Sequence, residues 1–352
     1  MDPRRIWERW KLRVAIFYMQ ITSIVDLHQF DKLKENWDSV YAADPYATVF
    51  LSWAWLRGWF EVIPYNWLVL AVKPDSGSSS VAFLGLSVQC IQDDGAGRLC
   101  TLRMGGNPLA DYTGFVCLPE FEDRAIASLA AFVQQQLTWD VFQIKDVFDL
   151  RIDSFLKYFS PNKFEIQNTK GISCPYVNLP VSWPQYLQDC LSPATRQSLV
   201  RKFRRFENLP GGRITEIEAG NVDIQIETLL TLWQMRWGVM PEHILNQYRS
   251  IFRRCFENHC LWLTILLDGI EPITGMVAFI DYKRKSFGFY ITGFDEKFAK
   301  LSPGQLIVGY SIRYAIENGF QIYDFLRGDE RYKFSFGALE RFNTDAKIRR
   351  RI

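Results

Sequence analysis

The strongest constraint on the fold of this chain is an order of strands and one helix that occurs in each half. In the second half, apolar runs of strand length are separated by turn residues, beginning with the hairpin turn at Asp268-Gly269. The expected elements there are strands at 261–267, 273–280 and 286–292, a helix at 304–318 and a strand at 321–326. The short final strand after a helix indicates a unit that mixes both kinds of structure.

The first half contains a looser copy of the same order. Its expected elements are strands at 67–72, 81–88, 99–104 and 114–118, a helix at 122–137 and a strand at 140–147. Two copies of one α+β unit, each a mixed sheet flanked by helices, are therefore expected instead of one large sheet. Proline and glycine between 161 and 184 mark the seam. The predicted division is an N-terminal extension at 1–22, a first domain at 23–170 and a second at 171–352.

Length and charge fit this division and narrow the class of partner. The chain has 352 residues, of which 48% are apolar and 23% charged, and its formal net charge is +2. This length suits two domains, and the near-neutral balance does not predict a DNA partner. No run of 18 apolar residues occurs, and the basic N-terminus lacks a small-residue cleavage site, so neither an integral membrane segment nor a signal peptide is expected. A cytoplasmic location follows as the expectation.

The cysteines and histidines predict no metal site. The seven cysteines are odd in number and contain no C-x-x-C pair, so reduced and mostly buried thiols are expected. His259 and Cys260 with Cys255 form a partial cluster without an evident fourth ligand, and ordinary packing is the preferred interpretation.

The most specific sequence feature is the stretch from Tyr323 to Gly337. It reads Tyr-Asp-Phe-Leu-Arg-Gly-Asp-Glu, followed by Tyr332-Lys333-Phe334 and Gly337. This pattern resembles the C-terminal signature of the CelD-like and FemAB-like branch of the GNAT acyltransferases. The resemblance covers residues 25–340 and implies tandem GNAT-like domains and N-acyltransferase activity. The first domain would then lie on the acceptor side and the second on the acyl-donor side.

Two stretches of the first half extend this resemblance. Phe50-Leu51-Ser52-Trp53-Ala54-Trp55 with Trp59 is similar to the opening of CelD-like proteins, and so is Arg103-Met104-Gly105-Gly106 before Asp111-Tyr112. Asp111 and Tyr112 are accordingly candidates for the acceptor pocket. Turn chemistry alone is the alternative explanation for the aspartate.

The resemblance implies acetyl-CoA or another acyl-CoA as donor, with its phosphates at the start of the helix near 304. The free N–H groups and dipole of a helix N-terminus favour anions, and Gly304 lets the backbone approach a pyrophosphate. The usual GNAT phosphate loop is shortened here, and an ordinary helix start is the alternative. The predicted donor-binding residues are Ile291, Thr292, Ser302, Pro303, Gly304, Gln305, Arg327 and Lys333.

The same stretch supplies candidates for proton transfer. Tyr332 stands where GNAT enzymes often place the tyrosine that protonates the leaving thiolate, and a core tyrosine is the alternative. Asp324 and Asp329 are candidate bases. Asp324 lies in an apolar run and should be buried with a partner, for which Arg327 is proposed, so the more accessible Asp329 is preferred as the base.

The expected function is transfer of an acyl group from acyl-CoA to an amine of a sugar, an amino acid or a cell-envelope or polysaccharide precursor. A FemAB-like aminoacyltransferase that uses aminoacyl-tRNA is the first alternative, and the basic helix at 192–206 would then contact tRNA. Its basic residues are spread around the helix, which favours a solvated face. A GNAT-like protein that binds a ligand or partner without turnover is the second alternative.

Overall fold

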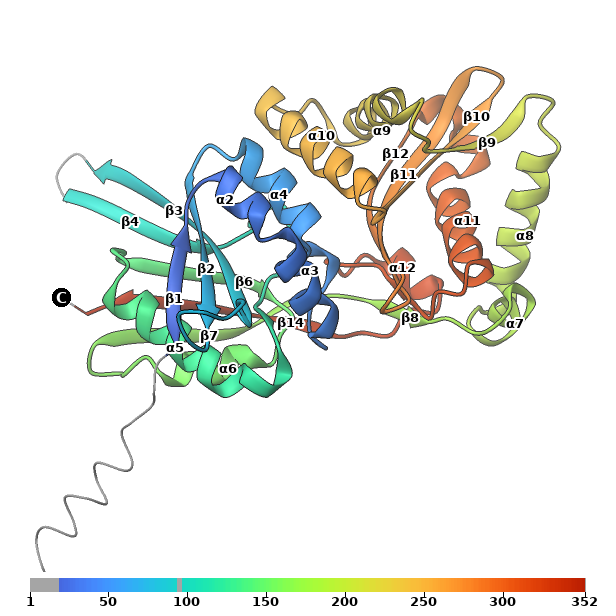
Figure 1. Cartoon of the computed structure of the whole chain (residues 1–352). Helices are drawn as coiled ribbons and strands as arrows, with labels where there is room; N and C mark the ends of the chain where they lie inside the picture. Colours follow the sequence, from blue (N-terminus) through green and yellow to red (C-terminus); the bar gives the residue numbers. More distant parts are fainter. Residues whose placement is uncertain (1–18, 94–96, 352) are drawn as a thin grey trace, which may run out of the picture.

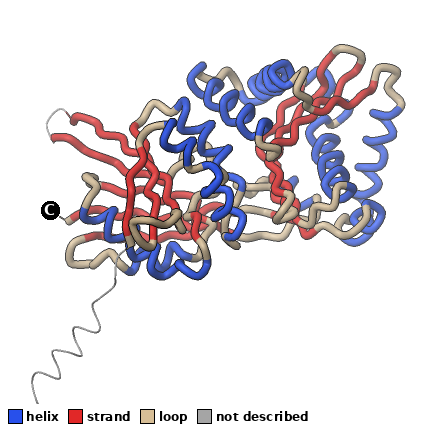
Figure 2. The backbone as a smooth tube through the Cα atoms, viewed as in Figure 1, coloured by secondary structure: helices blue, strands red, loops and turns tan. Residues whose placement is uncertain are grey.

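The computed structural model describes residues 19–93 and 97–351. Two mixed sheets lie side by side, each flanked by helices, so the predicted α+β class with two related units is confirmed (Figures 1 and 2). Most of the expected N-terminal extension falls outside the described residues, and the first strand, β1, begins at Gln20, inside that extension.

The first sheet has the strand order β1-β2-β3-β4-β6-β14-β7, with β5 paired to β3. Its strands are β1 (Gln20–Ile24), β2 (Asn66–Lys73), β3 (Ala82–Asp93), β4 (Gly97–Met104), β5 (Val116–Cys117), β6 (Val141–Val147), β7 (Phe164–Ser173) and β14 (Phe342–Arg350). The helices of this half are α2 (Leu27–Lys32), α3 (Lys34–Ala43), α4 (Trp53–Val62), α5 (Glu122–Gln135) and α6 (Arg151–Lys157), with short 3-10 turns η1 (Val49–Leu51) and η2 (Pro119–Phe121).

The second sheet has the order β8-β13-β12-β11-β10-β9. Its strands are β8 (Tyr176–Asn178), β9 (Gly212–Glu216), β10 (Leu261–Asp268), β11 (Glu271–Asp281), β12 (Ser286–Phe294) and β13 (Ile322–Asp324). Its helices are α7 (Trp183–Asp189), α8 (Pro193–Glu207), α9 (Val222–Trp237), α10 (Glu242–Glu257), α11 (Pro303–Glu317) and α12 (Arg331–Ser335), with η3 (Glu296–Leu301) before α11.

The two units share one topological element, a parallel strand pair connected through a helix. β4 pairs in parallel with β6, with α5 between them in sequence, and β12 pairs in parallel with β13, with α11 between them. The last strand of each pair carries the same Phe-Gln-Ile-x-Asp sequence, once at 142–146 and once at 320–324. Asp146 and Asp324 are therefore equivalent positions, each at the end of the returning strand.

The first sheet contains a strand from the end of the chain, and the second sheet begins with the strand that directly follows the first unit. The C-terminal strand β14 lies between β6 and β7, and β8, which follows the first unit, pairs antiparallel with β13 (Figure 1). The expected boundary at 170/171 falls inside β7, and the C-terminal strand, expected in the second domain, lies in the first sheet. Sequence patterning could not assign β14, because a strand's partners are chosen by long-range pairing.

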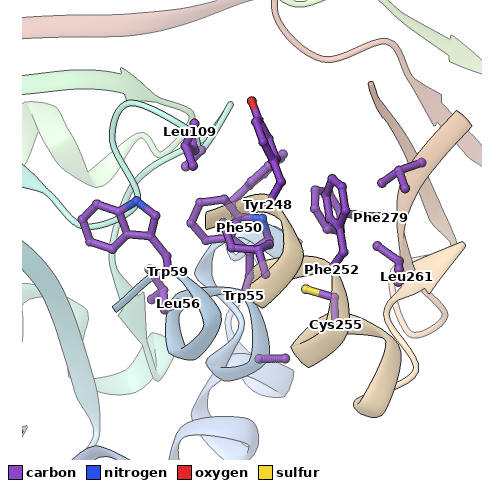
Figure 3. Packing of buried hydrophobic residues seen from close by; sticks show 14 of the residues in the cluster. Phe50, Trp55, Leu56, Trp59, Leu109, Tyr248, Phe252, Cys255, Leu261 and Phe279 are labelled. Atoms are coloured by element: carbon purple, nitrogen blue, oxygen red, sulfur yellow. The ribbon is translucent and has the colours of Figure 1, made fainter. Parts of the chain in front are cut away.

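The halves also join through a close crossing of two helices, α4 and α10. A Cβ added to Gly58 would lie 2.7 Å from Cα of Ile251, so the absence of a side chain lets the two backbones approach. Figure 3 shows apolar side chains of both helices filling this contact, among them Trp55, Phe252 and Cys255. One core cluster consequently runs from the first sheet to the second.

One cysteine pair departs from the expectation of reduced thiols. Cys90 and Cys100 face each other across β3 and β4 and form a disulfide. The sequence spacing gave no sign of it, because the pairing depends on the register of a hairpin. Five other cysteines are free. No helix in the described part of the chain is long and apolar enough to cross a bilayer. Within 19–93 and 97–351, no three His, Cys, Asp or Glu side chains gather as metal ligands.

Candidate active site

The parallel strands β12 and β13 stay paired only over a short stretch and then separate. Their register joins 286–288 to 322–324, at the start of β12. Farther along, β12 carries a bulge in which Tyr290 is the extra residue between the partners of Ala278 and Val277. The chain after β13 turns away at Leu326, whose backbone is left-handed with φ 56°. The second half of β12, where Ile291 and Thr292 lie, is thus free of its parallel neighbour.

The helix α11 begins beside this open strand edge. Ser302 precedes it in a left-handed conformation, with φ 54° and no hydrogen bond from its side chain to the helix. Pro303 occupies the first helical position, Gly304 is half-exposed and Gln305 is exposed. The first turn contains no acidic residue. These features leave the positive end of the helix dipole open to an anion.

The equivalent helix of the first unit differs at the same place. The first turn of α5 contains Glu122 and Asp123. In addition, the chain at Thr113 pairs in parallel with Val147 at the end of β6, where the second unit has its opening. Two carboxylates at a helix start repel an anion, and a paired strand end leaves no gap. Only the second unit retains the features of an anion-binding strand–helix junction.

A groove of about 280 Å³ lies beside the start of α11, between α8 and α12. Gln305 lines it from α11, Lys202 from α8 and Ser335 from α12. Burial and the neighbouring Arg201 and Arg205 lower the pKa of Lys202, which indicates a local excess of positive charge. The basic helix predicted at 192–206 is α8, and one of its cations, Lys202, therefore lies in the groove beside the predicted phosphate position.

Tyr332 lies on the same side of the sheet as this groove. Its ring packs edge-on to Phe325, with centroids 6.3 Å apart, in the core cluster that contains α11. Burial, with a contribution from Glu330, raises the pKa of the phenol well above its ordinary value. Tyr332 is therefore a neutral phenol that keeps its proton at physiological pH.

A second polar group lies on the opposite side, where the two sheets meet. The hydroxyl of Tyr112 donates to both carboxylate oxygens of Asp324, at 3.0 Å each, and Arg341 also pairs with that carboxylate. The backbone N–H of Leu326 donates to it as well, at 2.9 Å. Burial raises the pKa of Asp324, and the positive charge of Arg341 partly offsets the rise.

A cavity of about 380 Å³ opens at this cluster, over the point where β12 and β13 are paired. Its lining residues are Pro45, Tyr46, Ala47, Thr48, Val49, Phe50, Tyr112, Phe148, Phe279, Asp281, Arg284, Ser286, Gly288, Ile322, Asp324, Leu326 and Arg341. Phe279 and Leu326 belong to the core cluster between the sheets, whereas Phe325 and Tyr332 pack on the α11 side. The cavity and the groove thus lie on opposite faces of the second sheet.

Comparison with known proteins identifies part of this arrangement. Residues 193–334, from α8 to α12, match the family described as "Acetyltransferase (GNAT) domain". This part of the chain is similar to a GNAT domain. A search of curated proteins found no match.

Solved structures extend the likeness to the whole chain. The match to the crystal structure titled FemX covers 93% of this chain and 97% of the FemX chain, with a TM-score of 0.61 at 12% sequence identity. The match to L-PGS from Bacillus licheniformis covers 84% of this chain and 87% of the L-PGS chain, with a TM-score of 0.53 at 10% sequence identity. A tandem GNAT protein from the clavulanic acid biosynthesis pathway covers 93% and 98%, with a TM-score of 0.50 at 10% identity. At these identities the likeness shows a shared fold, that of tandem GNAT-like units.

Two residues predicted to bind donor phosphates have other partners within the protein. Arg327 pairs with Asp111 at 3.0 Å and with Asp146 at 2.6 Å, so it joins the two halves. The ammonium of Lys333 is buried, donating to the carbonyls of Arg327 and Gly328 at 2.7 and 3.1 Å. Arg327 is thus held by carboxylates of the first unit, and Lys333 by its own turn and by Glu330 at 2.9 Å. A donor phosphate would have to compete with these partners.

Asp324 is buried with a partner as expected, but the partner differs from the one predicted. Arg341, not Arg327, pairs with Asp324, while Asp329 is exposed on the turn before α12. Asp111, proposed for the acceptor pocket, instead binds Arg327, and Tyr112 does line the cavity. Sequence reasoning missed Arg341, since no local pattern marks a residue beyond the GNAT motif. The repeated Phe-Gln-Ile-x-Asp sequence could have identified Asp324 as a position that recurs.

Proposed function

We propose that this protein transfers an acyl group from acyl-CoA to an amine. The observation that carries the proposal is the acid-free start of α11 beside the open edge of β12, with a cavity on the opposite face. A thioester lying along β12 would place its phosphates at Gly304 and Gln305 and its carbonyl at the strand opening. An amine in the cavity could then attack through that opening. The first unit, with Glu122 and Asp123 at its helix start, serves the acceptor side.

Direct transfer requires only proton movement from the protein. The amine nitrogen forms a bond to the carbonyl carbon, and the carbon–sulfur bond breaks. An ammonium group loses one proton before attack and a second as the amide forms; the thiolate takes one, and one leaves to solvent. We assign the donation to Tyr332, whose raised pKa keeps it protonated, and the removal to Asp324, which lines the cavity. The exposed Asp329 takes second place as the base.

A charge change at the start of α11 tests donor binding without disturbing the fold. A side chain at position 304 would first meet the ring of Phe294 at 3.7 Å, an ordinary contact, so substitution is sterically tolerated. Gly304→Glu places a carboxylate at the predicted phosphate position, while a negative charge there favours the helix itself. Gly304→Gln has the same shape without the charge.

Acetyl-CoA and longer acyl-CoA thioesters should raise the melting temperature of the wild type and Gly304→Gln. They should not raise that of Gly304→Glu. Equal shifts in both variants would exclude α11 as the phosphate site, and no shift of the wild type with any acyl-CoA would exclude the donor.

Aminoacyl-tRNA is the second candidate donor, favoured by the basic residues of α8 beside the groove and by the fold shared with FemX. Arg201, Arg204 and Arg205 are exposed there and could contact a nucleic-acid backbone. Retention of charged tRNA that weakens as salt increases, without any acyl-CoA shift, would favour this candidate. Within acyl transfer, the CelD-like resemblance suggests sugar, amino-acid or cell-envelope precursors as acceptors, in a cytoplasmic enzyme.

A further inference from the structure

The cavity between the sheets has a composition that restricts its occupant. Its charged groups form two acid–base pairs. Asp324 pairs with Arg341, and Asp281 pairs with Arg284 at 2.7 Å. Each pair adds no net charge, so the cavity offers no free cation to a phosphate or a nucleotide.

Both arginines have further partners within the chain. Arg284 donates to the backbone carbonyls of Tyr41 and Asp44, at 2.6 Å each, which end the helix α3. The guanidinium of Arg341 lies over the rings of Phe148 and Tyr176, at 4.5 and 4.6 Å. A phosphorylated acceptor would have to break these contacts to gain an arginine, which makes such a ligand costly to bind.

The rest of the cavity wall is mostly apolar, with the hydroxyl groups of Tyr46, Thr48, Tyr112 and Ser286 as its other polar groups. Phe50 and Phe279 meet edge to face on one side, with centroids 5.5 Å apart, and both are buried. Ala47, Val49 and Leu326 continue this surface. Apolar walls with few polar groups are typical of pockets for small apolar molecules, and about 380 Å³ lies in the range of such pockets.

The wall formed by 45–50 is held in place by a buried ion cluster. Arg151 pairs with Asp44 at 2.9 Å and with Asp149 at 2.7 Å, all three side chains being almost fully buried. Asp44 also accepts from the backbone N–H of Tyr46, and the guanidinium of Arg151 lies 5.0 Å from the Tyr46 ring. The segment is therefore fixed at its first residues, and the cavity is preformed.

From this geometry we infer that the acceptor is a primary amine on an aliphatic or aromatic body, and not a nucleotide-linked or otherwise phosphorylated amine. The inference rests on the proposed function in one respect, namely that the bound amine receives the acyl group. The body lies against Phe50 and Phe279, and the amine lies at the Asp324 carboxylate. An acyl tail of the donor would also fit the apolar walls, but it has no positive charge with which to bind the Asp324 carboxylate.

Binding of amines without any acyl donor tests this inference independently of turnover. We would titrate the wild type with 2-phenylethylamine, with glucosamine and with a UDP-linked amino sugar by isothermal calorimetry. We expect 2-phenylethylamine to bind at least about tenfold more tightly than either sugar amine.

One matched pair of substitutions locates the site. Ser286→Phe fills the cavity, whereas Ser335→Phe makes the same change in the groove beside α11. Ser286→Phe should weaken 2-phenylethylamine binding at least about tenfold, and Ser335→Phe should leave it unchanged. Thr48→Phe narrows the cavity from the loop and replaces Ser286→Phe if that variant does not fold.

Three outcomes would overturn the inference: no binding of 2-phenylethylamine, equal or tighter binding of a sugar amine, or unchanged binding of 2-phenylethylamine by the folded cavity variant. A fourth outcome separates the two proposals. If 2-phenylethylamine binds in the cavity but receives no acyl group from any acyl-CoA that binds, the inference stands and the proposed acyl transfer fails.

Discussion

Tyr112 donates its phenolic hydrogen bond to Asp324 although 212 residues separate them in sequence. A second bond of the same kind lies alongside, in which Arg327 donates to the carboxylate of the neighbouring Asp111. The two stretches that resemble known acyltransferases in the sequence are thus bound to each other in space. Tyr112, Asp324 and Leu326 from these stretches line the cavity.

Tyr332 should act late in the reaction, when the thiolate leaves. Tyr332→Phe keeps the ring that packs on Phe325 and removes the hydroxyl group that would donate the proton. We expect kcat to fall about 10²–10³-fold with little change in the KM for acyl-CoA, measured by steady-state thiol release. Tyr282→Phe, at an exposed tyrosine, is the matched control. A loss confined to KM would show that Tyr332 only binds the donor.

Asp324 should set the acidic limb of the pH profile. Burial raises its pKa above the ordinary value of 3.8, and the ionised form is the one that accepts a proton. Activity should therefore rise with pH through a midpoint above 3.8, higher than for an unperturbed aspartate. Asp324→Asn should remove most activity at every pH, whereas Asp329→Asn should retain it. If Asp329→Asn instead lost more activity than Asp324→Asn, Asp329 would be the base.

Gly58 should control how closely the halves pack. A side chain there would overlap the backbone of Ile251, so Gly58→Val must part α4 from α10 and should lower the free energy of unfolding by about 1–3 kcal/mol. Gly220→Val meets nothing within 4 Å and should change it by less than about 0.5 kcal/mol. Urea denaturation followed by tryptophan fluorescence measures both. Equal effects would mean that the contact at Gly58 can relax freely.

Arg151 should be essential to the fixed shape of the loop 45–50. Arg151→Met leaves Asp44 and Asp149 buried without a cation, which should cost about 3–5 kcal/mol. Arg313→Met breaks an exposed pair with Glu317 and should cost less than about 1 kcal/mol. If Arg151→Met folds, its KM for the amine should rise while acyl-CoA still shifts its melting temperature. An unchanged amine KM would show that the loop keeps its shape without the cluster.

Local patterns predicted the second unit closely. The strand expected at 261–267 is β10 (Leu261–Asp268), and the helix expected at 304–318 is α11 (Pro303–Glu317). Periodicity and turn residues decide such elements over a few residues, so one sequence suffices. The strand expected at 114–118 is shorter in the structure, where only the two residues of β5 form a strand. Thr113, just before the expected strand, instead pairs with Val147 at the end of β6.

The site was less predictable for the same physical reason. The Ser302–Gln305 helix start and Tyr332 could be selected because each belongs to a local motif. The partner of Asp324 could not, since Arg341 reaches it from the segment that leads into β14. The disulfide of Cys90 with Cys100 and the cavity wall at 45–50 likewise depend on contacts between distant segments.

The place of β14 in the first sheet has a consequence for taking the protein apart. A cut between the units would remove β14 from between β6 and β7, whereas β8 would stay with the second sheet. The first fragment would expose the unpaired backbone edges of β6 and β7, and the second would carry β14 without its partners, so both would invite aggregation. The donor and acceptor halves should therefore refold only from one continuous chain, or from two fragments mixed while both are still unfolded.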